Sequence, residues 1–272
     1  MSERYDKLFK ELKKNSEGAF IPFVMLGDPG MEECEAVIET LIEGGADALE
    51  LGIPFSDPIA DGPVIQAAAN RALEKGATSD GCLDLLAKVR KKHPCVPMGL
   101  LVYANLVIGR GAERFYRRAS ESGVDSVLVA DVPAISSRAF VRCAQDNRIA
   151  PVFIAPPNAN NEQLREIAAL TKGYTYFLGR AGVTGADREM EAPLSARISL
   201  LKEAGAPPVV VGFGISRPEH VRLALEAGAE GAISGSATVS VIAANLDDAK
   251  KTREELMKFV KDLKAATRKA VA

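Results

Sequence analysis

About eight short apolar runs alternate with longer amphipathic stretches along this chain, and this alternation limits the possible folds more than any other feature. Each run is β-branched or otherwise apolar and is bounded by Gly, Pro or Asp, which is typical of a buried parallel strand. Between the runs, apolar residues recur with the spacing of amphipathic helices. The predicted strands lie at residues 19–26, 48–52, 98–103, 126–130, 150–155, 174–179, 208–214 and 231–235.

About eight strands, each followed by a helix, in about 250 residues predict an α/β fold of the (β/α)8 or TIM-barrel type. A doubly wound open sheet is the alternative, although such a sheet usually has fewer strands. No Pro/Ser-rich tract divides the chain, so residues 1–272 are expected to form a single domain. We also expect an extra N-terminal helix at residues 4–14 and a long C-terminal helix at residues 247–269. The other predicted helices lie at residues 31–43, 79–92, 112–122, 136–146, 162–170, 194–203 and 218–226.

The charge balance and the cysteine pattern argue against several classes of protein. With 34 Lys and Arg against 36 Asp and Glu, the formal net charge is −2, so the chain lacks the basic excess that nucleic-acid binding requires. No apolar stretch is long enough for a membrane span, and the charged N-terminus does not resemble a secretory signal. Four scattered cysteines without Cys-x-x-Cys spacing predict reduced thiols in a cytoplasmic protein and no metal site. Only two histidines occur, which leaves acid–base chemistry to carboxyl groups or tyrosines.

Glu50 is the first catalytic candidate because it lies within a predicted strand. In Leu49-Glu50-Leu51, strand alternation places the two leucines on one face and the carboxyl group on the other. If the leucines pack against the helices, Glu50 projects into the barrel, where loss of solvation raises its pKa toward the range useful for proton transfer. The alternative is an internal salt bridge, which barrel interiors also contain.

The loop after that strand, residues 53–63, carries two further acids, Asp57 and Asp61. Three prolines and a glycine make this loop stiff. Asp61 precedes a helix that begins near Val64, so one possible role is to cap that helix or to form an Asx turn. The other role is chemical, because two carboxyl groups on one strand and its loop provide the separated acid and base that hydrogen transfer needs.

Glycines cluster after the last three predicted strands, at residues 182–185, 212–214 and 235–236. Barrels often bind a phosphate after strands seven and eight, where backbone N–H groups and helix N-termini attract an anion. Glycine is common in β/α turns, but its recurrence after three neighbouring strands favours a phosphate site. Tyr174 and Tyr176 share one face of the sixth strand, so Tyr176 either contacts a ligand or packs in the core.

Longer blocks of the sequence resemble the α subunit of tryptophan synthase, in order and from residue 20 to residue 240. The most specific block is Leu49-Glu-Leu-Gly-Ile-Pro-Phe-Ser-Asp-Pro-Ile-Ala-Asp-Gly62. The chain departs from the family pattern at residues 134–136, which read Ala-Ile-Ser where the family commonly has an acidic pair, and at Gly179, where the family commonly has Ser. The other matching blocks lie at residues 22–29, 103–105, 123–131, 155–158, 182–185, 212–216 and 231–236.

This resemblance implies a retro-aldol cleavage of indole-3-glycerol phosphate to indole and glyceraldehyde 3-phosphate, without a cofactor or a metal. It implies that Glu50 is a mobile general acid–base that carries a proton between indole C3 and the glycerol hydroxyl group. Asp61 would accept the indole N–H and stabilise the positive charge that develops on the ring. The implied substrate contacts are Gly185, Gly214, Gly235 and Ser236 around the phosphate, Phe23, Leu101, Tyr176 and Phe213 around the indole, and Thr184.

The same resemblance implies a partner, a pyridoxal-phosphate β subunit that receives the indole for L-tryptophan synthesis in an α2β2 complex. Pro54 and Asp57 look like part of the docking surface, and residues 179 to about 191 look like a lid that orders over the substrate. A stand-alone lyase that releases free indole is the alternative. A regulatory or scaffolding barrel is the third hypothesis, and Glu50 and Asp61 argue against it, since a buried carboxyl group is costly unless it is used.

Overall fold

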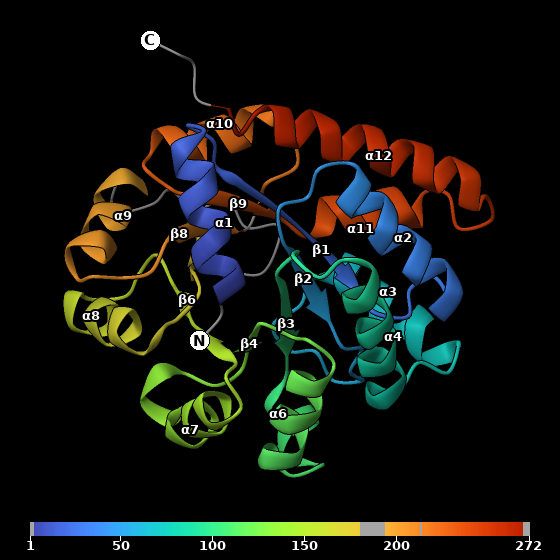
Figure 1. The fold of residues 1–272 in the computed structure, drawn as a ribbon, viewed down its shortest axis with the longest axis horizontal. Coiled ribbons are helices and arrows are strands. Elements are labelled where there is room, and N and C mark those ends of the chain that lie inside the picture. Colours follow the sequence, from blue (N-terminus) through green and yellow to red (C-terminus); the bar gives the residue numbers. More distant parts are fainter. Residues whose placement is uncertain (1–2, 180–193, 213, 269–272) are drawn as a thin grey trace.

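In the computed structural model, which describes residues 3–179, 194–212 and 214–268, nine strands form one parallel sheet that curves into a barrel. Helices surround this sheet (Figure 1). Apart from β5 and β6, consecutive strands along the chain are joined by helical segments, which is the connection that parallel pairing requires. The strands are β1 (Ala19–Met25), β2 (Leu49–Gly52), β3 (Met98–Val102), β4 (Ser126–Val129), β5 (Ala150–Val152), β6 (Ile154–Ala155), β7 (Thr175–Leu178), β8 (Val209–Gly212) and β9 (Gly231–Ser234).

The barrel closes through the short strands β5 and β6. The order of strands in the sheet is β5-β4-β3-β2-β1-β9-β8-β7-β6. Its two ends, β5 and β6, are separated in the chain by Phe153 alone, and the carbonyl of Phe153 accepts a hydrogen bond of 3.1 Å from the backbone N–H of Tyr176. The single predicted strand at residues 150–155 is therefore divided in two, and the eight predicted strands account for the nine observed ones.

The helices form the outer layer of the molecule. The predicted (β/α)8 fold with an extra N-terminal helix is confirmed. A five-residue helix directly after β3 is not predicted from the sequence, because it is too short to display a helical period. The helices are α1 (Glu3–Lys14), α2 (Met31–Glu43), α3 (Pro63–Glu74), α4 (Ser79–Lys92), α5 (Ala104–Ile108), α6 (Ala112–Glu121), η1 (a 3-10 turn, Ala134–Ser136), α7 (Arg138–Asp146), α8 (Asn161–Leu170), α9 (Leu194–Glu203), α10 (Pro218–Glu226), α11 (Ser236–Ala243) and α12 (Ala249–Ala265).

Alternation along the strands separates an inner from an outer core. On β2, Leu49 and Leu51 belong to the large apolar cluster between the strands and the helices. The side chains that fill the barrel interior come from other strands, for example Leu128 of β4 and Val210 of β8. Because successive side chains of a strand point to opposite faces, Glu50 faces the interior.

Helix α1 lies against the amino end of the barrel, where the strands begin (Figure 1). Tyr5 of α1 is fully buried, and its ring lies 5.4 Å from the ring of Tyr174. The Tyr5 hydroxyl is hydrogen-bonded at 3.0 Å to Oγ of Ser126, the first residue of β4. Among the described residues, Tyr5 of α1 thus covers the interior of the barrel at this end.

Helix α12 ends the described chain and packs on α2. It begins after Asp248, whose side chain accepts a hydrogen bond of 2.9 Å from the backbone N–H of Lys251, and it is shorter at both ends than the predicted helix at residues 247–269. Among the residues that the structure describes, no helix is both long enough and apolar enough to cross a membrane.

Candidate active site

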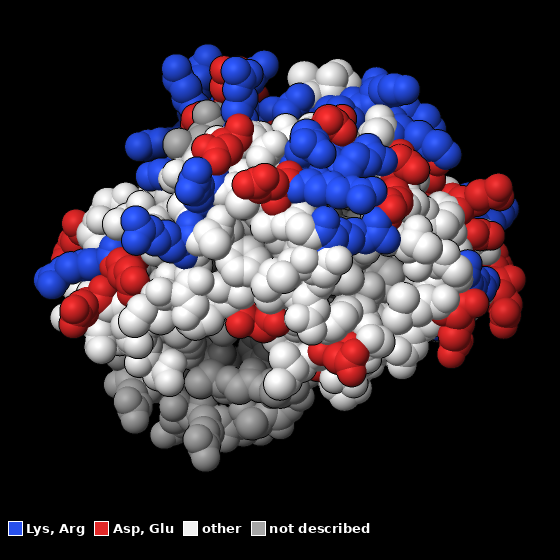
Figure 2. Space-filling view, turned by 90° about the horizontal axis from the view of Figure 1, so that it is seen from below, with Lys and Arg blue, Asp and Glu red and all other residues white. Residues whose placement is uncertain are grey.

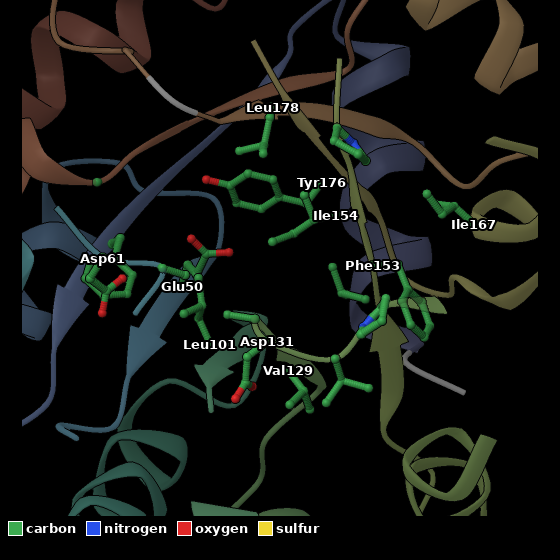
Figure 3. Close-up of a pocket in the computed structure, with 18 of the residues that line it drawn as sticks. Glu50, Asp61, Leu101, Val129, Asp131, Phe153, Ile154, Ile167, Tyr176 and Leu178 are labelled. Carbon is green, nitrogen blue, oxygen red and sulfur yellow. The ribbon is translucent and has the colours of Figure 1, made fainter. Parts of the chain in front are cut away.

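A cavity of about 860 Å3 opens at the carboxyl ends of the strands. Its size falls within the range of small-molecule sites, and its position is that of the active site in barrel enzymes. Eight of the residues predicted to form the site line this cavity, and Figure 3 shows Glu50, Asp61, Leu101 and Tyr176 among its walls. The eight are Phe23, Glu50, Asp61, Leu101, Tyr176, Gly214, Gly235 and Ser236.

Glu50 is a buried carboxyl group in the wall of this cavity, with an exposed fraction of 2%. The pKa of its carboxyl group is raised to about 8: burial is the largest cause, a hydrogen bond from Tyr174 lowers the pKa, and the nearby charge of Asp61 raises it. The Tyr174 hydroxyl donates that bond to Oε1 at 3.0 Å. Among the described residues no Lys or Arg pairs with Glu50, so the structure does not support the alternative of an internal salt bridge. A carboxyl group with a pKa of about 8 is largely protonated at pH 7, and a pKa perturbed in this way is typical of functional sites.

Asp61 approaches the cavity from the loop between β2 and α3. Burial raises the pKa of its carboxyl group, and a hydrogen bond with the Tyr103 hydroxyl lowers it. That hydroxyl also accepts a hydrogen bond of 3.2 Å from the backbone N–H of Ala60, and the Tyr103 ring stacks on Phe55 at 5.4 Å. Tyr103 therefore fixes the part of the loop that carries Asp61.

The helix-capping role considered for Asp61 is wrong. The residue that caps α3 is Gly62, and no side chain accepts a hydrogen bond at that cap. The backbone carbonyl of Asp61 accepts a hydrogen bond of 2.8 Å from the side chain of Gln66, which leaves the carboxyl group available to the cavity.

The opposite side of the cavity presents backbone groups from two loops. Gly235 precedes α11, whose first residue is Ser236, so the N–H groups of the first turn point outward at the positive end of the helix dipole. Gly214 follows β8 with a φ of +81°, a conformation that favours glycine. A Cβ atom on Gly214 or Gly235 would meet no atom within 4 Å. The open space above these two glycines suits an anion held by backbone N–H groups.

Apolar side chains form the walls between the two carboxyl groups and the glycines. Phe23 is 4% exposed and pairs in register with Glu50 across β1 and β2. Tyr176 extends along the cavity from β7 (Figure 3), and Gly212 on the neighbouring strand makes room for it, because a Cβ atom there would overlap the Tyr176 phenol. Together with Leu101, these rings form an apolar part of the cavity wall.

Some predicted residues are not part of this cavity. Pro54 and Asp57 lie in the loop after β2 and do not line it. Asp57 is exposed, and its Oδ2 accepts a hydrogen bond of 2.5 Å from the Ser56 hydroxyl. The remaining predicted contacts and most of the predicted lid lie outside the described residues: Thr184, Gly185, Phe213 and residues 180–191.

Two residues of the site have no role assigned from the sequence, Tyr174 and Tyr103. Tyr174 directly precedes β7, and the sequence predicts that it lies on the same face as Tyr176, but nothing local indicates that its hydroxyl reaches Glu50 on β2. Tyr103 lies in a block that resembles the family pattern, without any signal for its contact with the loop of Asp61.

A parallel β/α barrel with carboxyl groups in a pocket at the carboxyl ends of its strands defines a barrel enzyme that works by acid–base chemistry. The family described as tryptophan synthase alpha chain matches residues 9–268. The tryptophan synthase alpha chain of Klebsiella pneumoniae is 55% identical over 268 residues, covering 98% of this chain and 100% of that protein. That of Shigella dysenteriae is 54% identical over 266 residues, covering 98% and 99%. Tryptophan synthase subunit alpha from Legionella pneumophila, a crystal structure, superposes with a TM-score of 0.87 at 30% identity, covering 97% of this chain and 98% of that one.

The chain belongs to the tryptophan synthase alpha chain family, which confirms the resemblance read from its sequence. The match runs over nearly the whole of each relative, so the similarity is to the full α subunit and not to a shared barrel alone. An α subunit of tryptophan synthase, a lyase, is thereby supported over a stand-alone enzyme.

Proposed function

We propose that this chain cleaves indole-3-glycerol phosphate to indole and glyceraldehyde 3-phosphate and that Glu50 carries the proton. In its neutral form Glu50 protonates C3 of the indole ring, and the resulting carboxylate then takes the proton of the glycerol hydroxyl as the carbon–carbon bond breaks. The proton gained by C3 equals the proton lost by the hydroxyl group, so one carboxyl group suffices and the reaction needs no oxidant. The observation that carries this proposal is the buried Glu50 carboxyl group, bonded to Tyr174 and facing the cavity.

Asp61 has a different role in this proposal. Protonation of C3 places positive charge on the indole nitrogen, and a fixed anion stabilises such a charge best where water is excluded. Asp61 is held by Tyr103 and accepts the indole N–H. Asp61 is less buried than Glu50, and this difference in environment divides the two roles in the proposal: Glu50 carries the proton and Asp61 is the anion.

The phosphate group lies on the backbone N–H groups of Gly214, Gly235 and Ser236, with Thr184 and Gly185 contributing from the loop after β7. Phe23, Leu101, Tyr176 and Phe213 enclose the indole. Fixed dipoles hold the phosphate in this arrangement, so a near-zero net charge of the chain is sufficient. The proton balance requires neither a cofactor nor a metal of this chain, and pyridoxal phosphate belongs to the β subunit.

A β subunit docks on the rim of the barrel at the carboxyl ends of the strands, next to Pro54 and Asp57. Three large apolar side chains are exposed on the segments that follow β2, β3 and β4: Ile59 at 82%, Ile108, the last residue of α5, at 58%, and Ile135 of η1 at 82%. In the view of Figure 2, most of the Lys and Arg gather toward the top, and fewer charged side chains lie over the middle of that face. Exposed apolar groups on neighbouring loops are typical of a binding surface. We name Ile59, Ile108 and Ile135 the apolar rim.

The assembly is an α2β2 complex in the cytoplasm, and the chain acts in it as a single domain. Release of indole from indole-3-glycerol phosphate, measured with and without an added β subunit, tests the proposal. Strong stimulation by the β subunit is the expected result. A fast rate that the β subunit leaves unchanged would favour the stand-alone lyase, and no release under either condition would refute the proposed reaction.

A further inference from the structure

We propose that His220 is a positioning residue for the phosphate side of the site, because it fixes the loop between β8 and α10. This proposal rests on the function proposed above. The loop carries Gly214, Ile215 and Ser216 into the wall of the cavity. His220 lies in the first turn of α10 and reaches back to Ser216.

Little packing holds residues 214–216 in place at the cavity. Gly214 has no side chain, and the space where its Cβ would lie is empty. Ser216 is exposed, and among these three residues only Ile215 is buried. A segment with one buried side chain in three depends on hydrogen bonds for its position.

Two side chains supply those bonds from rigid elements on either side. The hydroxyl of Ser234, the last residue of β9, donates a hydrogen bond of 2.7 Å to the backbone carbonyl of Ile215. Nδ1 of His220 accepts a hydrogen bond of 3.3 Å from the backbone N–H of Ser216, and the Ser216 hydroxyl oxygen also lies 3.3 Å from Nδ1. The loop is thus held from β9 on one side and from α10 on the other.

The hydrogen bond from Ser216 determines the tautomer of the His220 imidazole. A backbone N–H can only donate, so Nδ1 must carry its lone pair and the proton of the neutral ring lies on Nε2. The backbone N–H of His220 donates a hydrogen bond of 3.0 Å to the backbone carbonyl of Arg217, so the imidazole is attached to an ordered helical turn. His220 thereby provides a fixed acceptor at the point where the loop leaves the cavity.

The consequence concerns the phosphate group and not the proton transfer. His220 does not line the cavity and lies on a different element from Glu50 and Asp61. If its contact is lost, the loop of Gly214 becomes less ordered, and each phosphate ligand must order it again on binding. The affinity for a phosphorylated ligand falls, whereas the affinity for the same ligand without phosphate does not.

The test compares His220→Ala and His220→Asn with the wild-type full chain. The probes are indole-3-propanol phosphate, which lacks the hydroxyl groups needed for cleavage, and indole-3-propanol, its unphosphorylated form. We expect His220→Ala to weaken binding of the phosphorylated probe and to raise KM for indole-3-glycerol phosphate, each about three- to tenfold. Binding of indole-3-propanol and kcat stay within about twofold. The variant His220→Asn, whose Oδ1 lies close to the place of Nδ1, restores both values.

A control and three contrary outcomes complete the experiment. The other histidine, His93, lies at the end of α4 on the far side from the cavity, and His93→Ala leaves all values unchanged. The proposal would be overturned if His220→Ala weakened binding of both probes equally or bound the phosphorylated probe with wild-type affinity. It would also be overturned if His220→Asn failed to restore binding of the phosphorylated probe. If the wild-type chain does not release indole, the proposed function fails, and the difference between the two probes still decides the role of His220.

Discussion

The hydroxyl of Tyr174, the residue before β7, donates a hydrogen bond of 3.0 Å to Oε1 of Glu50 on β2 across the interior of the barrel. Both groups are buried, so the bond is not weakened by competition with water. A donor of this kind stabilises the ionised carboxylate and opposes the effect of burial on its pKa. The pKa of Glu50, about 8, results from these opposing influences together with the charge of Asp61.

Removing that donor should move the alkaline limit of the reaction. In Tyr174→Phe the carboxylate loses a stabilising hydrogen bond, so the pKa of Glu50 rises and Glu50 remains protonated to higher pH. We expect kcat of the wild type to fall as the pH passes about 8, the pKa of Glu50, and kcat of the variant to fall about one pH unit later. A pH profile of indole release measures this. Tyr5→Phe is the matched control, because the Tyr5 ring contacts the Tyr174 ring but its hydroxyl is hydrogen-bonded to Ser126 and not to Glu50. An equal shift of the alkaline pH limit in both variants would contradict this assignment.

Glu50→Gln should abolish turnover and stabilise the fold at alkaline pH. The pKa of Glu50 is about 8 in the folded chain against 4.5 for the free group, so the folded wild type retains a proton that the unfolded chain has lost. The wild type therefore loses stability as pH rises from 4.5 to 8, whereas an amide does not titrate. We expect an advantage of the variant on the order of a few kcal/mol above pH 8 and little below pH 5.

Urea unfolding at pH 5, 7 and 9 measures the unfolding free energy of the Glu50 variant against the wild type. Glu32→Gln, a change to an exposed acid on α2, serves as the control and should show no such pH dependence. A difference between Glu50→Gln and the wild type that is the same at all three pH values would show that Glu50 does not carry the raised pKa.

The features that the sequence predicts are those that depend on neighbours in the chain. Alternation in Leu49-Glu50-Leu51 predicts which way the carboxyl group points, and the leucines in the outer core explain why it points inward. The strand periods predict the barrel because every βα unit repeats the same local pattern. These predictions need no knowledge of distant contacts.

The features that the sequence does not predict depend on contacts across the barrel. Tyr174 and Glu50 are 124 residues apart, and only closure of the barrel brings them together. The division of the fifth strand at Phe153 likewise reflects closure, since this residue lies where the two ends of the sheet meet. The choice between a cap and a chemical role for Asp61 depended on which residue begins α3, and element boundaries are poorly defined by local patterns.

Asp61→Asn should slow the reaction without unfolding the protein. The carboxyl group caps no helix, so its replacement by an isosteric amide removes no structural hydrogen bond at α3. It does remove the anion that balances charge on the indole ring, and loss of such stabilisation typically lowers kcat about 10²- to 10³-fold. Steady-state kinetics and thermal unfolding of the same sample measure the two effects. A lowered Tm with an unchanged rate would reverse this assignment.

Ile108→Asp should weaken docking of the β subunit and leave the chemistry of the α site intact. Ile108 belongs to α5, is 58% exposed and does not line the cavity. A charge at the centre of an apolar contact must be desolvated on docking, and the apolar burial of the isoleucine is lost, so we expect affinity for the β subunit to fall about tenfold or more. Titration calorimetry gives the affinity, and indole release without the β subunit checks the site. Leu223→Asp, at a similarly exposed leucine on α10, is the matched control. If both substitutions lowered the affinity for the β subunit equally, the apolar rim would not be the docking surface.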